Sequence, residues 1–175
     1  KMAKSNRSDL EKYCWMIVTK MSHKSGYTKK QINKRDKEIN KVSKFFKINS
    51  LENLEFDPAS LSKGNLNDLI TKISKCIKKF KPDTIFAPYL HDSHSDHFFS
   101  TYALNHILKS FRYPFIEKCY LYETLSETNQ NFTKKQQFNP NVYFDISKNL
   151  KNKLSAIKIY KSEVKKHPFP RSTAS

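Results

Sequence analysis

The chain has 175 residues, 37% of them hydrophobic, which suits one globular domain with a buried core. Its formal net charge of +17 first suggests a nucleic acid or another anionic surface as its partner. Nearly all of the cationic side chains are lysines spread along the whole sequence, whereas arginine is the preferred reader of bases and phosphates. We therefore expect no specific nucleic-acid partner, and we expect the lysines on solvated surfaces.

Scarce residue types narrow the class of protein further. Cys14, Cys76 and Cys119 lie far apart and form no Cys-x-x-Cys pair, so they are predicted to be buried free thiols in a reducing compartment. No run approaches about 18 apolar residues, and no signal-peptide segment opens the sequence, so a cytoplasmic protein without a transmembrane segment is expected. With Gly26 and Gly64 as the only glycines, a P-loop and a Gly-x-Gly-x-x-Gly loop are excluded.

Apolar periodicity predicts alternating strands and helices along the chain. The continuous apolar run from Tyr13 to Thr19 is typical of a central parallel strand buried on both faces, whereas Thr28 and Asn65 are predicted to cap helices. In chain order the pattern gives strands over 13–19, 54–56, 84–87, 118–123 and 141–146, helices over 28–46, 65–80, 98–111 and 147–164, and a polar loop over 126–139. This alternation predicts an α/β, Rossmann-like domain over 1–175, with a mainly parallel sheet and helices on both faces.

One turn concentrates the side chains used in metal and proton chemistry. His91, Asp92, His94, Asp96 and His97 occupy seven positions between the predicted strand over 84–87 and the predicted helix over 98–111. Ordinary turns draw on Gly, Asn, Ser and Pro, so a merely solvated turn is the less favoured interpretation. Polar residues between a strand and the following helix are a common place for an active site in an α/β protein.

A catalytic zinc ion takes three protein ligands of the His or carboxylate type and keeps a water molecule. His94 and His97 are three residues apart and are expected to project towards one pocket, with Asp96 orienting one imidazole and Asp92 orienting the other. Three ligands from this turn alone would be geometrically awkward, so at least one more must come from elsewhere. The supply elsewhere is thin, because no carboxylate is clustered with His23, His106 or His167.

The segment Asp92-Ser93-His94-Ser95-Asp96-His97 resembles the Asp-x-His-Pro-Asp-His motif of the PIG-L/LmbE-like zinc-dependent N-deacetylases, with Ser95 where proline is usual. Other parts of the chain resemble the same family in the same order. They include Arg35-Asp36-Lys37-Glu38, Lys81-Pro82-Asp83, Tyr122-Glu123, and segments within 145–163 and 167–172. The resemblance spans Trp15 to Ser172.

The resemblance implies a Rossmann-like fold and hydrolysis of an N-acetyl group on an amino sugar or sugar conjugate, with zinc or another divalent metal as cofactor. His97 would be a metal ligand. His94 would stabilise the oxyanion, and Asp92 and Asp96 would orient the two imidazoles, which makes these three the candidate catalytic residues. Arg35 would bind a hydroxyl or phosphate group of the substrate; the alternative, equally favoured, is that it pairs with Glu38 or Asp57.

The family's first strand ends in His-Pro-Asp-Asp-Glu, which supplies the general base and two metal ligands, and nothing in this chain matches it. Lys1 to Glu11 resembles the tail of the helix after that motif, and the chain ends soon after 170–172, where the family continues. We therefore expect a deacetylase domain truncated at both ends and inactive alone. A catalytically inactive sugar-binding or structural relative is the alternative. A domain without its first strand would expose a sheet edge, and we therefore expect a partner chain, such as a second copy in a homo-oligomer, or poor solubility.

Overall fold

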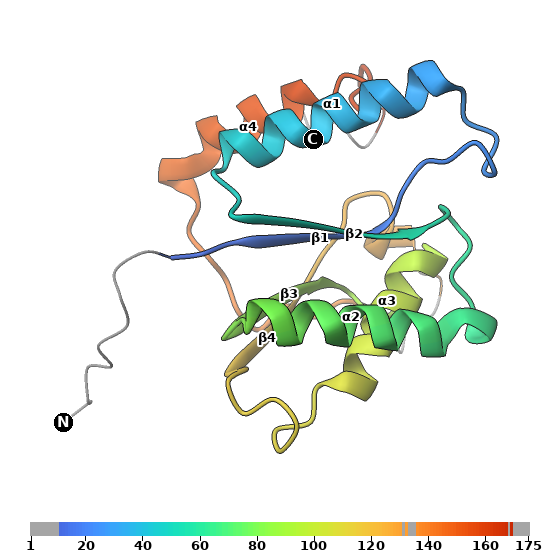
Figure 1. Ribbon diagram of the computed structural model, residues 1–175. Coiled ribbons are helices and arrows are strands. Elements are labelled where there is room, and N and C mark those ends of the chain that lie inside the picture. The colour runs from blue at the N-terminus through green and yellow to red at the C-terminus, as the bar shows by residue number, and fades with distance from the viewer. Residues whose placement is uncertain (1–10, 131, 133–135, 168, 170–175) are drawn as a thin grey trace.

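The computed structural model describes residues 11–130, 132, 136–167 and 169, in which strands and helices alternate (Figure 1). The strands are β1 (Cys14–Thr19), β2 (Ser50–Phe56), β3 (Thr84–Pro88) and β4 (Lys118–Tyr122). The α-helices are α1 (Lys29–Phe45), α2 (Leu66–Phe80), α3 (Ser95–Ile107) and α4 (Leu150–Ile159). Short 3-10 turns lie at η1 (Lys63–Asn65), η2 (Thr128–Gln130) and η4 (Ser147–Asn149). The family segments at 1–10, 168 and 170–172 fall outside the described residues.

All strand pairing in the described residues is parallel, β1 with β2 and β3 with β4. Helices α1 and α4 lie on one side of the β1–β2 pair, and α2 and α3 lie on the other (Figure 1). The predicted α/β, Rossmann-like class with parallel strands is therefore confirmed. The prediction of a single sheet differs from the structure. Within the described residues, the four strands form two separate pairs.

Local sequence explains where the first two helices begin. Thr28 caps α1 as predicted, because its hydroxyl accepts the N–H of Gln31 while the Gln31 side chain accepts the N–H of Thr28. Asn65 directly precedes α2, but its side chain makes no cap bond and instead accepts the N–H of Ser62. The predicted role of Asn65 as a capping side chain is therefore wrong, because its side-chain oxygen is bound to Ser62, the residue before η1.

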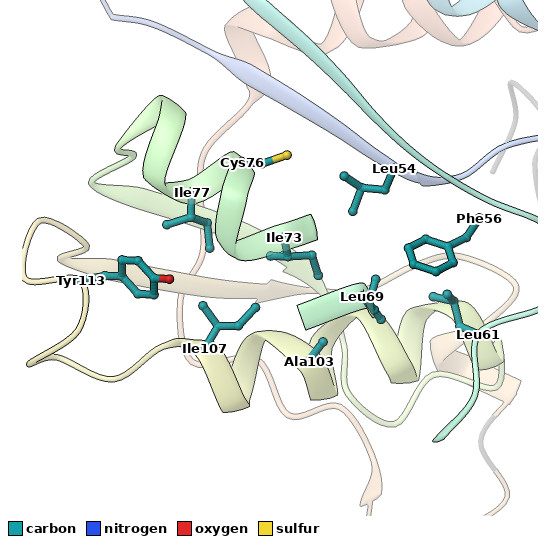
Figure 2. Packing of buried hydrophobic residues seen from close by; sticks show 10 residues of the cluster. All are labelled: Leu54, Phe56, Leu61, Leu69, Ile73, Cys76, Ile77, Ala103, Ile107 and Tyr113. Atoms are coloured by element: carbon teal, nitrogen blue, oxygen red, sulfur yellow. The ribbon is translucent and has the colours of Figure 1, made fainter. Parts of the chain in front are cut away.

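The core forms where the apolar stripe of α2 meets α3 and β2 (Figure 2). Leu69 and Ile107 have no exposed surface, and Ile73 is 2% exposed. The remaining members of the buried cluster are Leu54, Phe56, Leu61, Cys76, Ile77, Ala103 and Tyr113. Since α3 is held by this core along its length, the first turn of α3 has a fixed position relative to β3.

Two predicted elements differ because tertiary contacts override their local pattern. The strand predicted over 141–146 is absent, and Phe144 from this segment packs against Phe86 and Tyr120, with ring centroids 6.2 and 5.3 Å away. The helix predicted over 147–164 is shorter, since α4 ends at Ile159. The chain beyond α4 binds α1 instead, because the N–H of Ser162 donates to the buried Glu38 carboxylate at 3.1 Å.

Burial also departs from the sequence pattern in β1 and at the cysteines. None of the six residues of β1 is fully buried, although the apolar run predicted a strand covered on both faces. Cys76 is buried, whereas Cys14 is partly exposed and Cys119 is exposed on β4, so the prediction of three buried thiols is wrong for two of them. All three cysteines are free thiols in the structure.

Candidate functional site

The histidine turn lies at the carboxyl end of β3 and runs directly into α3. His94 is the N-cap of α3, since its Nδ1 accepts the backbone N–H of Asp96 at 3.1 Å. This capping starts α3 at Ser95, three residues before the predicted start. His97 lies in the first turn of the helix, and its ring stacks on that of His94 with centroids 4.9 Å apart and planes 19° apart. The two imidazoles therefore form one rigid pair at the helix start.

Asp92 fixes the ring of His97. The Oδ2 atom of Asp92 lies 2.8 Å from Nδ1 of His97, and its Oδ1 accepts the Thr128 hydroxyl at 2.6 Å. The carboxylate is enclosed, because Asp92 is only 7% exposed. A buried carboxylate needs hydrogen-bond donors on both oxygens, and His97 and Thr128 supply them.

In the neutral form of both rings, these hydrogen bonds require opposite tautomers. His94 accepts at Nδ1, so its proton sits on Nε2, and that atom is a hydrogen-bond donor. His97 donates from Nδ1 to Asp92, so its Nε2 carries a free lone pair. The stacked pair thus offers one donor and one basic nitrogen within a single turn of α3.

Asp96 is placed differently from the sequence expectation that it orients an imidazole. Its carboxylate accepts the N–H of Ala59 at 2.8 Å and the N–H of Leu61 at 3.3 Å, both in the loop after β2. Only the backbone N–H of Asp96 contacts His94. Asp96 is 5% exposed, and Ala59 has a φ of 57°, a left-handed conformation that the carboxylate contact stabilises.

Replacing Asp96 by alanine is expected to destabilise the protein by about 2 kcal/mol, because two backbone N–H groups lose their acceptor. Urea denaturation measures this change. Asp96→Asn keeps one carbonyl oxygen and should lose less. Equal stability of the Asp96→Ala variant and the unmodified chain would contradict the assigned contact.

Aspartate carboxylates connect the loops that follow the carboxyl ends of the strands. Asp57, after β2, accepts hydrogen bonds from Ser22 and, at 2.8 Å, from Ser25, both of which follow β1. Asp96 then holds the loop after β2 to α3, and Asp92 holds the loop after β3 to Thr128 beyond β4. A chain of contacts therefore crosses the carboxyl ends of all four strands. This arrangement gives the histidine pair a fixed frame.

Arg35 lies on α1. It pairs with Glu163, and its guanidinium carbon lies 5.6 Å from the centroid of the Tyr160 ring. Burial raises the pKa of that Tyr160 phenol to about 12, so the ring stays uncharged at neutral pH. The sequence suggested Glu38 or Asp57 as the structural partner of Arg35, and both suggestions are wrong. Glu38 instead binds Ser162, and Asp57 binds the serines after β1.

The fit of this site to a catalytic metal ion is incomplete. Within the described residues, no group of three or more His, Cys, Asp and Glu side chains is arranged to hold a metal ion. A catalytic zinc needs three protein ligands, and His97 beside its orienting carboxylate Asp92 would supply one of them. The residues present therefore do not by themselves fit a catalytic metal.

Sequence reasoning missed two parts of the site. Thr128 binds Asp92 from 36 positions further along the chain, inside a polar loop with no distinguishing motif. The backbone N–H groups of Ala59 and Leu61 carry no side-chain signal at all. A contact between Ser93 and Glu127, with the hydroxyl 2.9 Å from the carboxylate, adds a second tie between the same two loops.

Comparison with known proteins agrees with the resemblance of the histidine turn to the PIG-L/LmbE-like family. The family model "PIG-L: GlcNAc-PI de-N-acetylase" matches residues 4–108, and the chain therefore belongs to this family. The conserved protein TT1542 from Thermus thermophilus has a similar fold, with a TM-score of 0.67 and 19% sequence identity. That match covers 86% of this chain and 66% of TT1542, so the chain spans slightly less than two thirds of its relative. No curated protein matches the chain.

In the part of the chain that the structure describes, no helix combines the length and apolar character needed to cross a bilayer. The cytoplasmic location remains a prediction from the sequence.

Proposed function

We propose that this chain takes part in the de-N-acetylation of an N-acetylglucosamine conjugate. Membership of a family of de-N-acetylases supports this class of reaction. The single observation that carries the proposal is the pair of Nδ1 contacts, His94 with the N–H of Asp96 and His97 with the carboxylate of Asp92, from which opposite tautomers of the neutral rings follow. Hydrolysis of an acetamide needs a donor for the developing oxyanion and a separate electron-pair donor nearby, and the stacked pair offers both.

Each side chain has a distinct role in this proposal. His94 donates from Nε2 to the acetamide carbonyl oxygen and stabilises the negative charge that develops there. His97 presents its Nε2 lone pair as one ligand for a divalent metal, and Asp92 holds that ring in the required tautomer. Asp96 acts as a positioning residue, because it fixes the loop beside the start of α3.

The described residues leave part of the reaction unassigned. They include no group of three His, Cys, Asp or Glu side chains that could hold a metal, so two further ligands and the base that activates water are left unassigned. We therefore propose that the chain alone is inactive and depends on ligands from a segment outside these residues. The same incomplete ligand set favours a second candidate, a sugar-binding relative that has lost catalysis.

Cobalt(II) distinguishes the two candidates, because it broadens NMR signals close to where it binds. The full chain, with its histidines ¹⁵N-labelled, should show broadening centred on Nε2 of His97, and His97→Ala should abolish it. His106→Ala is the matched control, since Nδ1 of His106 contacts the Tyr102 carbonyl at the far end of α3. No broadening at His97 would favour the sugar-binding relative.

Acetate release from a soluble N-acetylglucosaminyl-inositol conjugate tests the catalytic part. With zinc present, the chain alone should release acetate no faster than the His97→Ala variant. Faster release that depends on His97 would contradict the inactivity of the isolated chain while supporting the reaction itself.

A further inference from the structure

The loop between α3 and β4 holds an aromatic ring in water. Phe111 is 82% exposed, and the turn that carries it is closed by the N–H of Arg112, which donates to the carbonyl of Lys109 at 2.8 Å. Tyr113, two residues further on, is 4% exposed and belongs to the buried cluster (Figure 2). The core therefore anchors this loop beside the exposed ring. One exposed apolar side chain is ordinary on a protein surface, so its surroundings decide its meaning.

A groove of about 490 Å³ runs between this loop and α2. Lys75 and Lys78 line it from α2, where they lie three residues apart on one face of the helix, and Arg112 lines it from the loop. All three of these residues are exposed. Thr71 and Ser74 add hydroxyl groups from α2, and none of the described residues that line the groove is acidic. The groove beside the exposed ring is therefore cationic.

The lysines of α2 fall into two groups. Lys72 and Lys79 each pair with a carboxylate, at 3.3 and 2.7 Å. Lys75 and Lys78, like Arg112, form no salt bridge with another residue in the part of the chain that the structure describes. No acidic side chain within that part neutralises the groove, so its positive charge is available to an anionic partner.

Helix α3 separates this surface from the histidine turn. His94 is the N-cap of α3, whereas the loop follows its last residue, and the 13 residues of the helix span about 20 Å. In Figure 1 the loop lies at the bottom of the molecule, on the side away from α1 and α4. Lys75, Lys78, Phe111 and Arg112 therefore form a second surface, which we call the basic loop face.

We propose that the basic loop face docks on a bilayer that contains anionic phospholipids. Cationic side chains beside an exposed apolar ring are the two elements of interfacial membrane binding, because the cations attract the headgroups while the ring enters the acyl boundary. A soluble phosphate compound would use the cations and leave the ring in water. The +17 charge of the chain adds long-range attraction to the same bilayer. Docking requires no catalysis at the histidine turn and is independent of the proposed function.

Co-sedimentation of the full chain with lipid vesicles tests this docking. Phosphatidylcholine vesicles with roughly 30% phosphatidylserine should bind the chain, and pure phosphatidylcholine vesicles should not. The double variant Lys75→Gln/Lys78→Gln should lower the vesicle affinity about 25-fold, because each cation contributes about fivefold. Lys34→Gln/Lys37→Gln is the matched control, since these exposed lysines of α1 have the same spacing and the variant removes the same charge. It should lower the affinity by less than about threefold.

Phe111→Ser keeps the charge and should lower the vesicle affinity about tenfold or more, because no ring enters the bilayer. His97→Ala should bind vesicles as the unmodified chain does, which keeps this test separate from the proposed function. Three results would overturn the docking: no sedimentation with anionic vesicles, equal losses for the two lysine pairs, or an unchanged affinity of Phe111→Ser. Tighter binding of single-stranded oligouridine through the same residues would also overturn it and would assign the basic loop face to nucleic acid.

Discussion

Replacing Asp92 by asparagine is expected to reverse the tautomer of His97. The asparagine side chain turns one of the two acceptors into an amide donor, and Thr128 retains the remaining oxygen because its hydroxyl needs an acceptor at 2.6 Å. The amide NH2 group then faces Nδ1 of His97, which must become the acceptor. The proton moves to Nε2, and His97 loses the lone pair that the proposed function assigns to a metal.

The ¹⁵N chemical shifts of the His97 ring measure this exchange of roles directly, because protonated and unprotonated nitrogens differ widely in shift. The affinity for cobalt(II) should fall about 10- to 100-fold, as it does when an orienting partner of a metal ligand is removed. Asp96→Asn is the matched control, since Asp96 contacts backbone amides of another loop and not the His97 ring. An unchanged His97 tautomer in Asp92→Asn would refute the assignment.

Leu69→Ala should cause a large loss of stability, about 3 kcal/mol, because Leu69 has no exposed surface and lies where α2 packs on the core (Figure 2). The lost side chain leaves a cavity that the neighbouring helices only partly close. The free energy of unfolding from urea denaturation provides the measurement.

Leu150→Ala is the control for this substitution. Leu150 begins α4 and is 47% exposed, so its truncation should cost well under about 1 kcal/mol. Similar losses for the two variants would show that the core is not where the buried cluster places it.

Long periodic segments and the compact histidine turn were predictable from the sequence. Helix α1 follows its pattern closely, because Thr28 and Gln31 form a local capping box that needs no tertiary partner. The motif around His94 and His97 is equally local, since all four of its His and Asp side chains lie within six residues. Local chemistry of this kind is visible in sequence because spacing alone brings the groups together.

Features that depend on distant contacts were not predictable. The segment 141–146 has strand composition but packs through Phe144 on β3 and β4 instead of pairing. The role of Asp96 was missed because its partners are the N–H groups of Ala59 and Leu61, and backbone amides are the same for almost every residue. Thr128 lies beside Asp92 because β4 pairs with β3, a contact between segments distant in sequence.

The carboxylate ties across the strand ends have a consequence for how this protein tolerates changes in loop length. In most α/β domains a surface loop accepts an inserted residue without effect elsewhere. Here the loop after β2 is bound on two sides. Its Asp57 accepts a hydrogen bond from Ser25, and its Ala59 and Leu61 donate to Asp96. An insertion within residues 57–61 would shift the first turn of α3 and with it the stacked histidines. The loops of this edge can therefore change length only together.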